Sequence, residues 1–214
     1  MAIVVIGGHS RSVGKTSVVV GLISALREFD WTAVKITQYG HGVCSAKGAP
    51  CDCATDDHSW AISEEKDRGG ESDTSRFLVA GALKALWVRT EQGRLAEAMP
   101  ALRKRLEHAP HVIVESNSVL KFLRPDLYLT VLDPGTEDFK TSAREFLDRA
   151  GAVILHDGLR AGSAWQGVSL KPVAERPVFL ITPPRYVTPE IVEFVRNFVS
   201  SARTADSSPE ARSE

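Results

Sequence analysis

The fold of this 214-residue chain is decided by the segment Gly8-His-Ser-Arg-Ser-Val-Gly14-Lys15-Thr16. It follows a short β-branched run from Ala2 to Ile6, which is typical of a strand buried on both faces of a parallel sheet. After Thr16, apolar residues recur at helical spacing and predict a helix that packs back on this strand; they are Val19, Leu22, Ile23, Leu26 and Phe29. The chain therefore opens with a strand, a glycine-rich loop and a helix.

The alternation of strands and helices continues along the chain. Short apolar runs predict further strands at Thr32–Ile36, Ala85–Val88, Val112–Glu115, Leu127–Asp133, Ala152–His156 and Val178–Thr182. Helical patterns cover Leu95–Leu106 and Thr141–Arg149, and Thr188-Pro189 opens a last helix. This order predicts an α/β fold in which a mostly parallel sheet carries helices on both faces, as one domain over residues 1–200.

Composition excludes several classes of protein. With 43% apolar residues, 25% charged residues and a net charge of -1, the chain has an ordinary globular composition and shows no bias toward nucleic acid or membrane partners. Its longest apolar runs are far shorter than the roughly 20 residues of a membrane span. The N-terminus lacks the pattern of a secretory signal, so we expect a cytoplasmic protein.

Two segments depart from the α/β rhythm. Residues 38–73 lack a clear apolar period, and a loop of this length inside a compact domain is usually functional. Residues 201–214 are rich in Ser, Ala and charge and are predicted to form a disordered tail, since they bury too little apolar surface to offset their ordering entropy.

The loop that ends at Thr16 has the chemistry of a phosphate cradle. Backbone N–H groups converge on an anion there, the helix N-terminus adds partial positive charge, and Lys15 adds a full charge. Thr16 would bind Mg²⁺, and a Cβ at position 14 would collide with phosphate oxygens. His9 and Arg11 either face the nucleotide or a partner subunit, or face water. The predicted nucleotide contacts are Gly8, Ser12, Val13, Gly14, Lys15, Thr16, Ser17 and Lys35.

The loop departs from the common phosphate-loop spacing and so points to particular families. The common pattern is G-x4-G-K-[ST], whereas this chain has G-x5-G-K-T. The longer spacing resembles that of dethiobiotin synthetases, and Lys35-Ile-Thr-Gln38-Tyr-Gly40 is similar to the K-P-x-Q-T-G segment at their second strand.

A second resemblance covers Gly70-Glu-Ser-Asp73-Thr-Ser-Arg76-Phe-Leu-Val-Ala-Gly-Ala82. This segment resembles the G-K-D-S-x-R-x-x-x-A-G-A signature of MobB-type accessory proteins of molybdopterin-guanine dinucleotide biosynthesis, and Val112–Glu115 resembles their strand ending in Glu. The histidine-rich stretch of that family is missing between Gly40 and Gly70. These families belong to the SIMIBI group of P-loop NTPases, so the resemblance implies a homodimer around GTP or ATP, with a protein partner in cofactor or metal-centre assembly.

Carboxylates follow predicted strands where ligands bind in open α/β sheets. Mg²⁺ prefers oxygen ligands, so Thr16 with Asp73 or Glu115 forms a plausible set, and Asp133 competes with Glu115. The family resemblance favours Glu115. The predicted catalytic residues are Lys15, Glu115 and Asp73, whereas Lys35 is either a second phosphate contact or a solvated strand-end lysine.

The chain's three cysteines form a separate candidate site. Cys44, Cys51 and Cys53, with His41, offer thiolates and an imidazole that suit zinc, nickel or an iron–sulfur cluster. Either both sulfurs of the Cys-x-Cys pair reach one ion within the loop, or two chains each donate the pair. The second arrangement resembles the Cys-x-Cys motif of CooC-type nickel-insertion ATPases. Alternatively, the thiols bind no metal and one or two are redox-active.

These features support one function and leave rivals open. The first hypothesis is Mg²⁺-dependent binding and slow hydrolysis of a nucleoside triphosphate, in an accessory role in molybdenum cofactor biosynthesis. The rivals are a metallochaperone NTPase that holds its cargo at the cysteines, a dethiobiotin synthetase-like ligase or small-molecule kinase, and a scaffold that binds nucleotide without hydrolysis. No Asn-Lys-x-Asp guanine-reading motif is visible, so ATP and GTP both stay open.

Overall fold

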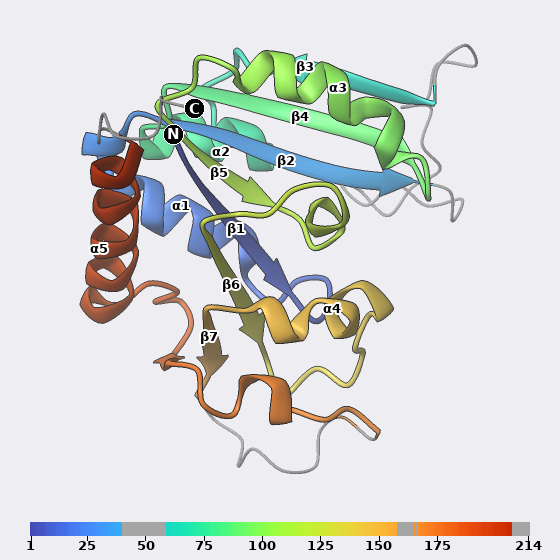
Figure 1. Cartoon of the computed structure of the whole chain (residues 1–214), viewed down its shortest axis with the longest axis vertical. Helices are drawn as coiled ribbons and strands as arrows, with labels where there is room; N and C mark the ends of the chain where they lie inside the picture. Colours follow the sequence, from blue (N-terminus) through green and yellow to red (C-terminus); the bar gives the residue numbers. More distant parts are fainter. Residues whose placement is uncertain (40–58, 158–164, 166, 207–214) are drawn as a thin grey trace, which may run out of the picture.

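The computed structural model of the protein describes residues 1–39, 59–157, 165 and 167–206. They form one eight-stranded sheet in the order β3-β4-β2-β5-β1-β6-β7-β8 (Figure 1). The strands are β1 Ala2–Gly8, β2 Trp31–Tyr39, β3 Trp60–Glu64, β4 Lys84–Glu91, β5 His111–Glu115, β6 Leu127–Leu132, β7 Ala152–His156 and β8 Val178–Ile181. All neighbouring pairs are parallel except β3 with β4, which confirms the predicted mostly parallel sheet.

Helices cover both faces of this sheet, as predicted. They are α1 Lys15–Ala25, α2 Asp73–Ala80, α3 Leu95–Leu106, α4 Thr141–Glu145 and α5 Pro189–Asp206. In Figure 1, α3 and α4 lie in front of the sheet, and α1 and α2 lie behind it. The side chains of α1, α2 and α5 share one apolar core, while α3 and the turn after α4 contribute to a second core on the opposite face.

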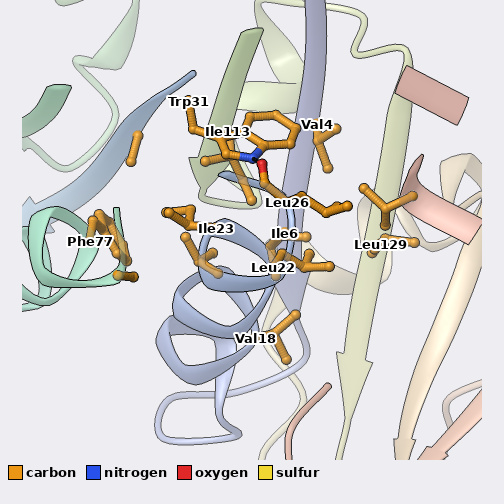
Figure 2. Close-up of a cluster of buried hydrophobic side chains, with 14 of the residues drawn as sticks. Val4, Ile6, Val18, Leu22, Ile23, Leu26, Trp31, Phe77, Ile113 and Leu129 are labelled. Atoms are coloured by element: carbon orange, nitrogen blue, oxygen red, sulfur yellow. Dashed lines mark hydrogen bonds between the residues drawn. The ribbon is translucent and has the colours of Figure 1, made fainter. Parts of the chain in front are cut away.

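The core behind the sheet fixes the position of α1. Figure 2 shows Leu22 and Ile23 of α1, and Leu26 just after it, lying among side chains from β1, β2, β5, β6 and α2. Leu26 also ends the helix next to Trp31, whose indole Nε1 donates to the Leu26 carbonyl at 2.8 Å. Because this packing holds the body of α1 on the sheet, it also fixes where the N-terminus of α1 lies above the sheet edge.

Three features differ from the sequence-based expectations. Gly8, which was expected to begin the loop, is the last residue of β1. The segment 38–73 contains β3, an edge strand whose residues are all half-buried and therefore give no clear apolar period. The last helix continues to Asp206, whereas the disordered tail was expected to begin at residue 201.

The candidate metal residues Cys44, Cys51, Cys53 and His41 lie outside the described residues. Within the described ranges, no group of three or more His, Cys, Asp and Glu side chains gathers so that it could hold a metal ion. In the same part of the chain, no helix combines the length and apolar character needed to cross a membrane.

The packing of α1 predicts a large stability loss on truncation of Leu22, which is fully buried. Leu22→Ala removes apolar contacts and leaves a cavity, so we expect the free energy of unfolding to fall by about 2–5 kcal/mol. Leu83→Ala is the matched control, because Leu83 is 64% exposed and its truncation should cost under about 0.5 kcal/mol. Urea unfolding of both variants checks this; equal losses would contradict the assigned core.

Candidate functional site

The loop after β1 is attached to the sheet through Asn117. Gly8 N donates to Asn117 Oδ1 at 3.0 Å, and Asn117 Nδ2 donates back to the Gly8 carbonyl at 2.8 Å. A Cβ at Gly7 would lie 2.1 Å from Asn117 Oδ1, so only glycine leaves room for this side chain. The pair of hydrogen bonds therefore sets the direction in which the loop leaves β1.

The buried side chain of His9 anchors the first half of the loop to neighbouring backbone groups. Its side chain is fully buried, Nδ1 lies 2.7 Å from the Asp138 carbonyl, and Nε2 accepts from Asp133 N at 3.0 Å. Burial lowers the pKa of His9, which favours the neutral ring that this pattern requires. His9 thus has a structural role, and the expectation that it faces a ligand, a partner or water was wrong.

The second half of the loop carries the lysine. Gly14 has φ 87°, a left-handed conformation that favours glycine, and a Cβ there would lie 2.2 Å from the ring of Tyr186. Lys15 begins α1 and donates from Nζ to the Ser10 carbonyl. Burial lowers the pKa of Lys15 to about 8. Among the described residues Lys15 has no carboxylate within ion-pair distance, so its charge is available for an anion.

A polar cluster lies directly beside this loop. Thr16 Oγ1 donates to Glu115 Oε2 at 2.9 Å, and Lys35 Nζ bridges Glu115 Oε1 at 2.5 Å and Asp73 Oδ2 at 2.8 Å. Lys35 Nζ also lies 3.4 Å from Thr16 Oγ1. The four predicted residues come from α1, β2, α2 and β5, and the fold brings them together at the carboxyl edge of the sheet.

Charge balance in the cluster depends on Lys35. Glu115 is 4% exposed, so its carboxylate would be costly to bury without a cation. Burial alone would lower the pKa of Lys35, but Glu115 and Asp73 outweigh it and the pKa is raised. The ammonium group therefore lies between two carboxylates, where a divalent cation would also be attracted.

The donor set fits Mg²⁺. The hydroxyl of Thr16 and the carboxylates of Glu115 and Asp73 are hard oxygen donors, and Mg²⁺ needs only one or two carboxylates beside phosphate and water. Asp133, the rival of Glu115, instead accepts from Gly135 N at 2.9 Å and Thr136 Oγ1 at 2.9 Å. These hydrogen bonds outweigh the effect of burial and lower the pKa of Asp133. The geometry therefore favours Glu115 as the carboxylate beside Thr16.

The predicted loop residues lie together at the start of α1. Gly8 ends β1, Ser12 is exposed and has φ 57°, the Val13 side chain is buried, and Ser17 is half-buried in the first turn of α1. Their roles as nucleotide contacts stay predictions.

Sequence reasoning missed the supports of the loop, which are Asn117, Tyr186 and His156. His156 Nε2 lies 3.0 Å from the Val13 carbonyl, and its ring packs edge-on against Tyr186. Asn117 and His156 carry the one available sequence signal, because each lies at or just beyond the end of an apolar strand, where polar side chains reach the sheet edge.

Solved structures are similar to this chain to different degrees. HypB from Helicobacter pylori, solved in complex with nickel, is 16% identical, with 99% of this chain and 92% of that chain covered and a TM-score of 0.50. A MobB homolog from Bacillus stearothermophilus is 15% identical over 94% of this chain and 99% of that chain, with a TM-score of 0.46. LpxK from Aquifex aeolicus, solved with ATP, is 17% identical over 84% of this chain and 53% of that chain, also with a TM-score of 0.46.

No family model matches the chain, and no curated protein matches it significantly. At an identity of 16%, the likeness to HypB shows the fold alone. The chain thus has a P-loop NTPase fold.

The cluster predicts that Lys35→Met destabilises the protein, because Glu115 is then buried without its cation. We expect a loss of about 2–4 kcal/mol in the free energy of unfolding, partly restored by millimolar Mg²⁺. Lys84→Met is the matched control, since it breaks a more exposed ion pair with Glu64 and should cost under about 1 kcal/mol. Thermal melts with and without Mg²⁺ measure both effects; a Lys35→Met protein as stable as the wild type would refute this charge balance.

Proposed function

We propose that the protein binds a Mg²⁺-nucleoside triphosphate at the loop between β1 and α1 and hydrolyses it. The observation that carries this proposal is the hydrogen bond between Thr16 and Glu115 directly beside Lys15. At this place lie together a helix N-terminus, a set of oxygen donors, and the Lys15 ammonium group, which pairs with no carboxylate of the described residues. These are the groups that a polyphosphate and its metal ion require.

Backbone groups and the Lys15 side chain of the loop would both bind the phosphates. Backbone N–H groups of residues 12–17 would donate to the phosphate oxygens, and Lys15 would exchange its bond to the Ser10 carbonyl for a phosphate oxygen. Lys140 and Lys35 both disfavour the charged form of Lys15, so an incoming polyanion relieves repulsion among these cations. Binding therefore gains from the charge of Lys15, which no carboxylate of the described residues pairs with in the free protein.

The carboxylates would hold the metal ion, and water would be the molecule that attacks the nucleotide. Mg²⁺ neutralises the charge that develops on the transferred phosphoryl group. Thr16, Glu115 and Asp73 would hold and orient this ion, and Lys35 would move from the carboxylates toward the γ-phosphate. Water would then attack the γ-phosphorus and break its bond to the bridging oxygen, so that inorganic phosphate and the nucleoside diphosphate are released. We propose that turnover is slow without a partner.

For the cellular role, we propose an accessory function in molybdenum cofactor biosynthesis, in the cytoplasm, as a homodimer with a protein partner. Its support is the MobB-like segment from Gly70 to Ala82, whose Asp73 begins α2 and pairs with Lys35. The second candidate is a metallochaperone NTPase that carries zinc, nickel or an iron–sulfur cluster. It rests on the Cys44, Cys51, Cys53 and His41 set together with the fold shared with nickel-bound HypB.

Substitution of Lys15 tests the nucleotide site. We expect Lys15→Ala to weaken binding of Mg²⁺-ATP or Mg²⁺-GTP by about 100-fold or more, because a buried charge-assisted contact is lost. Lys66→Ala is the control, since Lys66 is 79% exposed and its one ion pair among the described residues is with the half-buried Glu64. Calorimetric titration of both nucleotides measures the affinities. Absence of saturable binding in the wild-type protein, or equal affinity of Lys15→Ala, would refute the proposal.

The lowered pKa of Lys15 also predicts a pH dependence of binding. A bound phosphate favours charged Lys15, so the pKa in the complex lies above the value of about 8 in the free protein. Affinity should be constant below about pH 7 and should fall up to about tenfold per pH unit above pH 8, until the pKa of the complex is passed. Titrations from pH 6.5 to 9.5 check this, and Lys15→Arg should lose the dependence. A rise in affinity with pH would contradict the assignment.

A further inference from the structure

A second group of side chains lies on the sheet face that α2 covers, beyond the start of α2. It consists of Thr37 of β2, Trp87 and Arg89 of β4, and Ser63 of β3, and we name it the Arg89 platform. All four side chains are half-buried. Neither the nucleotide site nor the apolar core uses them.

The register of the strands places these residues side by side. Lys35 is opposite Trp87, Thr37 is opposite Arg89, and Ser63 is opposite Trp87. Alternate residues of a strand share one face, so the platform continues the face that carries Lys35. Trp87 Nε1 donates to Thr37 Oγ1 at 3.0 Å, and the Arg89 guanidinium carbon lies 4.6 Å from the centre of the Trp87 ring. The tryptophan thereby holds the guanidinium against the sheet.

The guanidinium of Arg89 has few hydrogen-bond acceptors among the described residues. Its one hydrogen bond within the described part of the chain is a long contact of 3.5 Å from a terminal nitrogen to Ser63 Oγ. Its Nε is buried and has no hydrogen-bond partner there, and no carboxylate of the described residues pairs with it. By contrast, Arg94, just beyond the end of the same strand, pairs with both Glu91 and Glu97. A partly buried guanidinium with so few acceptors is costly, and an oxyanion would supply the acceptors that it lacks.

The platform lies within molecular reach of the polar cluster. Arg89 is opposite Thr37, two residues beyond Lys35, so the two levels are separated by about 7 Å along the strand. A small molecule whose anionic end binds Arg89 would extend back to Lys35 and Asp73. This position is on the side of the cluster away from β1 and the phosphate loop.

We propose that the Arg89 platform binds a small oxyanion-bearing molecule, a carboxylate or a phosphate, whose other end reaches Lys35. The anion accepts hydrogen bonds from the Arg89 guanidinium, and the Thr37 and Ser63 hydroxyls lie beside it. The inference deepens the proposed function, because it places a second ligand next to the γ-phosphate position. Anion binding at Arg89 itself does not require hydrolysis.

The test uses the full chain saturated with a non-hydrolysable ATP or GTP analogue and Mg²⁺, so that the phosphate loop is occupied. Succinate and inorganic phosphate are titrated separately at constant ionic strength while tryptophan fluorescence is recorded. We expect a saturable change with at least one probe, and its loss in Trp87→Phe would assign the signal to the platform. Succinate alone would indicate a carboxylate ligand, and phosphate alone a phosphorylated one.

Arg89→Gln should raise the half-saturating probe concentration about tenfold or more, because a charge-assisted contact is removed. Arg105→Gln is the matched control, since it removes the same charge from an exposed position on α3 and should leave probe binding unchanged. Arg89→Lys keeps the charge but not the planar fork, and should give an intermediate loss. Nucleotide affinity should be the same in all variants, and thermal melts establish that each is folded.

The outcomes separate this inference from the proposed function. Normal nucleotide binding with no saturable response to either probe, or with equal responses in folded Arg89→Gln and Arg105→Gln, would overturn the platform and leave the nucleotide site standing. A loss of nucleotide affinity in Arg89→Gln would assign Arg89 to the nucleotide site and would also overturn it. Failure of the wild-type protein to bind the analogue would refute the proposed function, whereas the probe titrations would still test Arg89.

Discussion

The hydrogen bond from Thr16 Oγ1 to Glu115 Oε2, 2.9 Å long, connects the start of α1 to the end of β5. It spans 99 positions of sequence and depends on a carboxylate that is almost fully buried. Such a carboxylate is tolerated only with a cation nearby, and Lys35 supplies it from β2. The need to compensate this one charge therefore ties together α1, β2 and β5, and through Asp73 it includes α2.

The loop between β1 and α1 is held by neighbours on both sides before any ligand arrives. Asn117, just beyond the end of β5, hydrogen-bonds both backbone groups of Gly8, and the His9 ring is hydrogen-bonded to the segment after β6. Tyr186 packs on Gly14 from the segment after β8. Preorganised backbone donors do not have to reorient when an anion binds, so a loop held in this way suits the binding of phosphate.

Two cationic groups are left poorly compensated on neighbouring parts of the sheet edge. Lys15 donates to a backbone carbonyl, and Arg89 lies against the ring of Trp87 with a buried Nε that has no hydrogen-bond partner in the described part of the chain. Lys35 lies between them in the strand order and is already neutralised by Glu115 and Asp73. The arrangement offers two anion positions separated by a charge-balanced cluster. It is therefore compatible with a triphosphate and a second anionic molecule approaching each other at Lys35.

The sequence by itself determined the local elements, because a strand, a helix or a phosphate loop is encoded by neighbouring residues. The runs at 152–156 and 95–106 correspond to β7 and α3, and Gly14-Lys15-Thr16 opens α1 as predicted. The half-buried edge strand β3 was not predicted, because the apolar period of its sequence is weak. Tertiary structure alone decided the strand order and register, which depend on packing between distant segments. They place Glu115, and not Asp133, beside Thr16, because α1 packs against β1 and β5, and the end of β6 is bonded to His9 and Thr136 instead.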